Sequence, residues 1–228
     1  LLEIIERDAF MRHWLNQEAG LLVPHDKTPK PIIARVAALE AAGCRISLQQ
    51  LPSQWAHVAL ISAQHEELHF TTMGMAANAN FGVALDSALG ELEARVYAWI
   101  HGHAPSISDP KEVRTTEHHF ELYGLKRYFK RADKVLFPTQ GQTLTAWPKS
   151  LPVSSLPQLV KRFAGRNVQP LIVDITPKNC YIDQGRTPLS VVKALIPGLL
   201  PISFGYQREP LGMVSRIHPG SKFPHPFP

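Results

Sequence analysis

The sequence lacks the features that would assign it to a membrane or to an oxidising compartment. Its 228 residues include two cysteines, Cys44 and Cys180, too few for the disulfide framework of a secreted scaffold and not spaced as zinc ligands. No run approaches the roughly 18 consecutive apolar residues of a membrane span, and no basic segment precedes an apolar one near the start. These absences predict a soluble protein of the reducing cytoplasm.

The glycine-rich phosphate-binding motifs and the serine-hydrolase motif are absent as well. The chain contains no G-x-x-x-x-G-K-[ST], G-x-G-x-x-G or G-x-S-x-G motif. Residues 65–69, HEELH, have the H-E-x-x-H spacing, but they adjoin extended runs rather than lying on the helix that such a zinc site needs, so most histidines are expected to be surface or core residues. A nucleotide site, if there is one, therefore has to be built from other residues.

Composition and charge are typical of an ordinary globular protein. Hydrophobic residues make up 44% of the chain and charged residues 19%, so there is enough apolar material for a core. The formal net charge of +5 would suit a polyanion if it were clustered, but the densest basic stretch, residues 126–134, has the spacing of a solvated helix face. We therefore do not expect nucleic acid as a partner.

Hydrophobic periodicity predicts helices and then strands in the first part of the chain. The sequence opens inside an apolar helical stripe, so we expect a helix to about Asn16. Because no cap residue precedes this helix, we expect the sequence to be the C-terminal part of a longer protein. A second helix is expected over residues 31–42, ended by Gly43, and extended runs follow at residues 44–51, 57–62 and 68–72.

The remainder of the chain combines small-residue, helical and extended segments. Residues 74–82 are small and predict a flexible loop, after which Asp86 or Ser87 is expected to cap a helix that runs to about His101. The later segments are predicted as helices at 116–134 and 156–164, a polar loop at 140–155, extended segments at 170–175 and 190–196, and an aperiodic tail at 210–228. No linker is long enough to divide domains.

Two groups of carboxylates are candidates for chemistry. Glu3 and Glu6 are one helical turn apart and so share a face, with Cβ atoms roughly 5–6 Å apart. They form either a solvated face close to Arg7 or a pair of hard oxygen ligands for Mg²⁺. In the predicted helix 86–101, spacing does not decide whether Glu91 or Glu93 points inward, but Glu91 lies at the edge of the apolar stripe and could reach an interior site.

The end of the sequence is the most unusual segment. Pro224, Pro226 and Pro228 alternate with other residues, which enforces an extended, stiff strand with few backbone donors. Such a strand could deliver the end of the chain to a definite place. The alternative is a disordered tail, and in either case we expect the segment to bury little surface.

Four blocks of this sequence, in the same order, resemble the YcaO family, and specifically its azoline-forming cyclodehydratases. They are LLEIIERDAFMRHW, FGVALDSALGELEARVYAW, LIVDITPKNCYIDQGRTPLSVVKALIPGLLPISFG and the ending PHPFP. One departure is Ala94, three residues after Glu91, where the family often has glutamine. The resemblance implies an α+β fold of the YcaO type, a mixed sheet with flanking helices. Residues 1–228 would be the C-terminal portion of one catalytic domain whose N-terminal part is missing from the sequence, with 210–228 as a proline-rich tail.

The resemblance also implies an activity. It is the ATP-dependent conversion of Cys, Ser or Thr in a ribosomal precursor peptide to thiazoline or oxazoline, through phosphorylation of the backbone amide oxygen, as in the biosynthesis of thiazole/oxazole-modified bacteriocins. By resemblance, Glu3, Glu6 and Glu91 would bind Mg²⁺ and, with Arg208, ATP. The tail residues Pro224, Pro226 and Pro228 would act beside the substrate amide.

Partners and rival functions follow from the same resemblance. The expected partners are the precursor peptide, a leader-peptide-binding protein, fused or separate, and a flavin-dependent azoline dehydrogenase. One alternative function is thioamide formation, which uses the same ATP chemistry with a sulfide donor. The other is a noncatalytic scaffold that docks a peptide.

Overall fold

The computed structural model describes residues 1–153, 155–178, 180–182, 187–208 and 223–227. The chain divides into two compact units: the larger comprises Leu2–Pro152 and Leu200–Pro228, and the smaller comprises Leu1 and Val153–Leu199. The two units are described separately below. Among the described residues, no helix combines the length and the apolar character that crossing a membrane requires.

The larger unit is built on a four-stranded antiparallel sheet, which confirms the predicted α+β class. The strands are β1 (Leu21–Leu22), β2 (Cys44–Leu51), β3 (His57–His65) and β4 (Phe70–Asn78), and they lie side by side in chain order. The register pairs Leu48 with Ile61 and Ile61 with Gly74. Among the described residues, β4 is therefore the last strand of this sheet, and one of its edges has no strand beside it.

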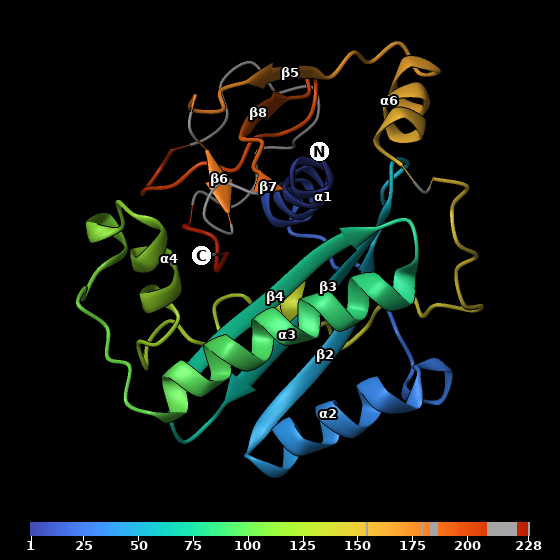
Figure 1. Cartoon of the computed structure of the whole chain (residues 1–228). Helices are drawn as coiled ribbons and strands as arrows, with labels where there is room; N and C mark the ends of the chain where they lie inside the picture. The colour runs from blue at the N-terminus through green and yellow to red at the C-terminus, as the bar shows by residue number, and fades with distance from the viewer. Residues whose placement is uncertain (154, 179, 183–186, 209–222, 228) are drawn as a thin grey trace. The chain divides into compact units, whose positions relative to one another are not determined.

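Two helices, α2 (Lys30–Ala41) and α3 (Phe81–Ile100), cover one face of the sheet (Figure 1). Side chains alternate along a strand, so every second residue of β3 points to this face. Together they form one buried cluster that includes Ile32, Val36, Ala59, Ile61, Ala63, Leu85, Leu89 and Leu92. α2 ends where predicted, before Gly43, whose φ of +91° is the left-handed conformation that favours glycine.

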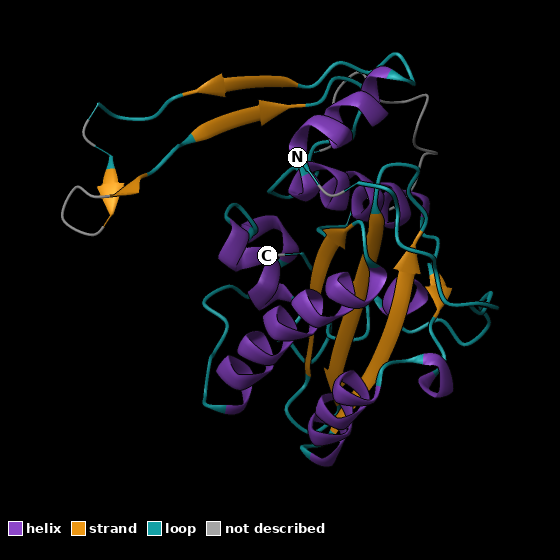
Figure 2. Cartoon of the chain, turned by 45° about the vertical axis from the view of Figure 1, so that its right-hand side comes forward, coloured by secondary structure: helices purple, strands orange, loops and turns teal. Residues whose placement is uncertain are grey.

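The opposite face of the sheet carries α1 (Leu2–Asn16), the helix predicted from the start of the sequence. The alternate residues of β3 and β4 that face this side are buried: Val58, Leu60, Met73 and Met75. α1 contributes the buried side chains Ile5, Phe10 and Trp14. Figure 2 shows the helices and strands of this unit from a second direction.

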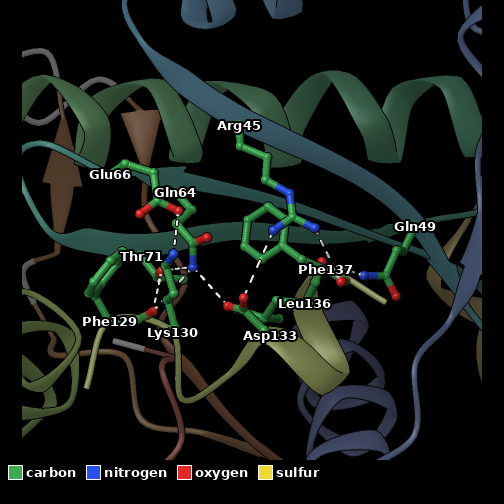
Figure 3. A network of polar contacts seen from close by, with 10 residues as sticks. All are labelled: Arg45, Gln49, Gln64, Glu66, Thr71, Phe129, Lys130, Asp133, Leu136 and Phe137. Atoms are coloured by element: carbon green, nitrogen blue, oxygen red, sulfur yellow. Dashed lines mark hydrogen bonds and ion pairs between the residues drawn. The ribbon is translucent and has the colours of Figure 1, made fainter. Parts of the chain in front are cut away.

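A polar network on the α1 side attaches the short helix α5 (Asp133–Leu136) to the sheet (Figure 3). The amide of Gln64 donates to Thr71 Oγ1 at 2.9 Å and to Asp133 Oδ1 at 2.8 Å. Gln49 donates to the carbonyl of Leu136 at 2.8 Å. Because buried polar groups need a partner, these two amides fix where α5 lies against the sheet.

Two sequence predictions in this unit are wrong. Residues 74–78 continue β4, and α3 begins at Phe81 with Asn80, rather than Asp86 or Ser87, as its cap. The small residues of this segment serve close packing instead of flexibility: a Cβ on Gly74 would lie 2.1 Å from the carbonyl oxygen of Ala88 on α3. The predicted helix 116–134 is also interrupted.

The interrupted segment contains α4 (Thr116–Leu122), a series of turns, and then α5. Gly124, two residues after the end of α4, packs against Trp99, whose ring would lie 2.0 Å from an added Cβ. The remaining elements of the unit are two short 3₁₀ helices, at His25–Lys27 and Pro110–Glu112.

The smaller unit contains α6 (Leu156–Ala164), the short helix predicted before Gly165, with Leu159 and Phe163 buried. Its strands are β5 (Leu171–Asp174), β6 (Tyr181–Ile182), β7 (Thr187–Pro188) and β8 (Val192–Leu195). β5 pairs with β8 and β6 with β7, both antiparallel. The predicted extended segments at 170–175 and 190–196 are thus confirmed as a strand pair.

Candidate functional site

The three predicted carboxylates come from two helices that flank the open edge of β4. Glu3 and Glu6 lie in the first turns of α1, and Glu91 lies on α3. Glu91 Oε2 accepts a hydrogen bond from the backbone N–H of Met75 on β4 at 3.3 Å. Because β4 ends the sheet in the part of the chain that the structure describes, no strand there pairs with this N–H, and Glu91 satisfies it.

Gly74 sets how closely α3 approaches this edge. An added Cβ at Gly74 would be 3.1 Å from the Cβ of Glu91 as well as overlapping the backbone of α3. A larger residue would therefore push α3, and Glu91 with it, away from β4. The glycine that the sequence suggested as a loop residue is in fact what positions a candidate ligand.

Glu6 is the buried member of the group and interacts electrostatically with the other two. It is 9% exposed, and burial, followed by the charges of Glu91 and Glu3, raises its pKa from 4.5 to about 7. Arg7 and Arg95 act in the opposite direction. A positive charge placed beside Glu6 would therefore stabilise its ionised form.

Glu3 differs from Glu6 in its surroundings. Its side chain is 68% exposed and forms an ion pair with Arg7, one helical turn later. The spacing of Glu3 and Glu6 allowed either a solvated face close to Arg7 or a pair of Mg²⁺ ligands. Glu3 has the solvated arrangement, whereas Glu6 is buried. Within α1, then, the two carboxylates have separate environments.

The structure separates Glu91 from Glu93, which spacing alone could not do. Glu93 is held by the guanidinium of Arg35 on α2 through two hydrogen bonds of 2.8 and 2.6 Å, and Arg35 also binds Asp86 at 2.6 Å. Glu93 thus belongs to the contact between α2 and α3, whereas Glu91 faces β4 and α1.

Arg95 is the residue of this site that the sequence analysis missed. It lies one turn after Glu91 on α3, with its Nη2 at 3.6 Å from Glu91 Oε2, and its Nη1 donates to the carbonyl of Met73. Its side chain is 22% exposed, and burial lowers its pKa against the opposing effects of Glu91 and Glu6. The i, i+4 spacing of Glu91 and Arg95 was the available signal.

The donor chemistry of this group suits a hard divalent cation. All three candidates offer carboxylate oxygens, which are the ligands that Mg²⁺ takes in proteins. Glu6 adds a buried carboxyl group whose pKa is raised first by burial and then by the charges of Glu91 and Glu3. Among the described residues, no group of three or more His, Cys, Asp or Glu side chains is already arranged to hold a metal. Metal binding by Glu3, Glu6 and Glu91 stays a prediction.

The described part of the proline tail, Phe223–Phe227, is packed into the larger unit, contrary to the expectation that it buries little surface. Pro224 and Pro226 are buried, while Pro228 lies outside the described residues. Tyr123 donates its hydroxyl to the carbonyl of Pro224 at 2.6 Å. The tail has few donors of its own, so side chains of the core satisfy its carbonyls.

Two stacked histidines hold the centre of the tail. The rings of His119 and His225 lie 4.0 Å apart. His119 Nε2 accepts from the N–H of Gly205 and its Nδ1 donates to the carbonyl of His225, both at 2.8 Å, so His119 is neutral. His225 Nε2 donates to the carbonyl of Ser203 at 2.9 Å. Burial is the largest cause that lowers the pKa of His119 to about 4 and that of His225 to about 3.

The tail also lies close to the carboxylates along α1. Phe227 packs on Phe10 with ring centroids 5.4 Å apart. Phe10 is four residues after Glu6 and so lies on the same face of the helix, about one 5.4 Å turn away. The disordered alternative is therefore wrong for residues 223–227, and Phe227 lies about one helical turn along α1 from Glu6.

Arg208, the fourth predicted binding residue, lies with the tail rather than with the carboxylates. It is exposed, its side chain crosses Gly205, and it helps to line a cavity of about 20 Å³ beside Phe223 and Pro224. The principal charges acting on Glu6 do not include Arg208. Its role in nucleotide binding stays a prediction.

Comparisons with known proteins agree with this architecture. Residues 1–200 match the family described as YcaO cyclodehydratase, ATP- and Mg²⁺-binding. The fold is similar to that of a YcaO protein from Methanopyrus kandleri bound with AMPPCP and Mg²⁺, with a TM-score of 0.64 and 19% identity over 87% of this chain and 50% of that one. No curated protein sequence matches the chain.

Two further solved structures are similar. One is a heterocyclase in complex with substrate and cofactor, with a TM-score of 0.64 and 16% identity over 99% of this chain and 31% of that one. The other is the E. coli microcin synthetase McbBCD complex with pro-MccB17 bound, with a TM-score of 0.54 and 15% identity over 86% of this chain and 48% of that one.

At these identities the structural likeness establishes the fold. The chain spans half or less of the length of these three proteins. The family match covers most of the chain, including both helices that carry the candidate carboxylates. The chain belongs to the YcaO family.

Proposed function

We propose that this protein is the part of an ATP-dependent cyclodehydratase that holds the metal-nucleotide end of the active site. The observation that carries the proposal is the juxtaposition of the buried Glu6 with Glu91 across the edge of β4, in a chain of a family described as ATP- and Mg²⁺-binding. The packed proline tail, one helical turn away, supports the azoline-forming branch.

The reaction converts a peptide amide to an azoline. The thiol or hydroxyl of a Cys, Ser or Thr attacks the preceding amide carbon, and the resulting hemiorthoamide oxygen takes the γ-phosphoryl group of ATP, which releases ADP. Loss of that oxygen as phosphate, with the amide proton, forms the C=N bond of the ring. Phosphorylation is needed because an amide oxygen is otherwise a poor leaving group.

The chain's own residues have three tasks in this scheme. Glu6 and Glu91 bind the cation. Glu3 becomes a third ligand once its ion pair with Arg7 breaks. When bound, Mg²⁺ neutralises phosphate charge. The hydrogen bond from Met75 and the close packing at Gly74 orient Glu91 before the nucleotide arrives. The tail, Pro224 to Pro228, closes the site on the substrate side, and Arg208 contacts phosphate or substrate there.

The substrate in this proposal is a ribosomal precursor peptide, recognised with the help of a leader-binding partner and oxidised afterwards by an azoline dehydrogenase. A YcaO enzyme that forms thioamides is the rival within the same chemistry. A noncatalytic docking scaffold is the rival outside it. The product mass and the ATP dependence distinguish the three.

The test is peptide-stimulated ATP hydrolysis by the full-length protein with its partner and precursor peptide, followed by mass analysis. We expect ATP to be consumed and one water to be lost per ring formed. Exchange of oxygen for sulfur would indicate the thioamide rival. Absence of peptide-stimulated hydrolysis would support the scaffold and contradict the proposal.

A further inference from the structure

The guanidinium of Arg95 interacts with two of the three candidate carboxylates, Glu91 and Glu6. It is held on two sides: its Nη1 donates to the carbonyl of Met73, and its Nη2 pairs with Glu91. Its charge also acts on Glu6 across the gap between α3 and α1. Arg95 thus compensates the two carboxylates that the proposed function assigns to the metal.

The two contacts of Arg95 differ in strength. Its distance to Glu91, 3.6 Å, is longer than the roughly 2.7–2.9 Å of a close charge-assisted hydrogen bond. By contrast, Arg35 donates two hydrogen bonds, of 2.8 and 2.6 Å, to Glu93, which lies on the same helix as Glu91. Arg95 is therefore anchored to the backbone of β4 and only loosely paired with Glu91, so Glu91 can turn to another cation while Arg95 keeps an acceptor.

We propose that Arg95 is a built-in counter-cation that holds Glu6 and Glu91 in place before a divalent ion binds and that lowers the affinity of the site for that ion. This inference rests on the proposed function, since it needs Glu91 to be a metal ligand. Arg95 is in this sense a positioning residue that sets metal affinity. Replacing its charge leaves the site more negative and should tighten binding.

The test uses Mn²⁺ as the probe, with the full-length protein free of nucleotide, and measures free Mn²⁺ by electron paramagnetic resonance. We expect Arg95→Gln to lower the Mn²⁺ Kd about tenfold, which is about 1.4 kcal/mol. Arg95→Lys keeps the positive charge, so its Mn²⁺ Kd should stay within about twofold of the wild-type value. Arg35→Gln removes an arginine of α2 that binds Glu93 on the other side of α3, and it should leave the Mn²⁺ Kd unchanged.

Folding is checked by circular dichroism, and Arg95→Met, which keeps the packed stem, replaces Arg95→Gln if the latter unfolds. Glu91→Gln, combined with each variant, separates the two claims. If wild type binds no Mn²⁺ that depends on Glu91, the proposed metal site itself fails. If binding depends on Glu91 but neither neutral variant at Arg95 tightens it, the metal site stands and the counter-cation inference is wrong.

Discussion

The stacked pair of His119 and His225 predicts that acid destabilises the packed tail. Burial lowers the folded-state pKa of His119 to about 4 and that of His225 to about 3, both below the ordinary 6.5, so both imidazoles are neutral at pH 7. Below pH 6.5 the unfolded chain therefore binds protons that the folded chain does not. Stability is lost as the pH falls from 6.5 towards 4, and the loss is absent above 6.5.

The size of this effect follows from the depressed pKa values. Each pKa unit corresponds to about 1.36 kcal/mol, so lowering the pH to 4.5 costs up to about 2.7 kcal/mol for each histidine. The two together give about 5 kcal/mol, comparable with the whole stability of a small domain. Protonation of both would also place two positive charges on rings that are stacked 4.0 Å apart.

The assay is urea unfolding at pH 7.5 and pH 4.5, followed by tryptophan fluorescence and circular dichroism. Trp14 reports on the tail because its Nε1 donates to the carbonyl of Phe223 at 3.2 Å. His225→Gln, which does not titrate, should reduce the loss of stability on acidification by about 2–3 kcal/mol. His25→Gln, at an exposed position, is the control. An equal loss in wild type and His225→Gln would refute the reasoning.

Two further predictions concern the carboxylate site. Gly74→Ala should cost about 3 kcal/mol of stability, because the new methyl group overlaps the backbone of α3 at Ala88. Gly90→Ala, on the exposed side of α3, should instead stabilise the protein by about 0.5–1 kcal/mol. Thermal melts compare the two variants, and similar shifts would contradict the close packing at Gly74. Since burial raises the pKa of Glu6 to about 7, its ionisation costs the folded state up to about 3 kcal/mol above pH 7 and nothing below pH 4.5. Metal-free Glu6→Gln should therefore gain stability at pH 8 but not at pH 4.5, as urea titrations would show, and a loss at pH 8 would argue against a buried, uncompensated carboxylate.

Local sequence signals predicted the elements whose ends are marked by strong formers or breakers. α1 follows from its apolar periodicity, α2 from the glycine after it, and α6 from Gly165. β4 and the start of α3 were misplaced because Gly74 and the alanines after it look alike in a loop and in a strand packed under a helix. Only the position of α3 shows that this glycine is a requirement of packing.

The candidate site was predictable as residue types but not as an environment. The sequence could place Glu3 and Glu6 on one helix, yet only the tertiary structure makes Glu6 buried and Glu3 exposed. Arg95 is held by the carbonyl of Met73 on β4, and no local sequence pattern predicts that β4 is an edge strand. Likewise, His119 and His225 are 106 positions apart, and their stacking results from how the tail folds back on α4.

The most direct test of the account compares Glu91→Gln with Glu93→Gln in the full-length protein. Both remove one carboxylate from the same helix, but Glu91 faces β4 and Glu6, while Glu93 binds Arg35. Loss of a charged metal ligand should slow peptide-stimulated ATP hydrolysis about a thousandfold in Glu91→Gln, equal to about 4 kcal/mol of barrier, and leave Glu93→Gln within about threefold of wild type. Near-native hydrolysis and ring formation by Glu91→Gln would contradict the assignment of this site.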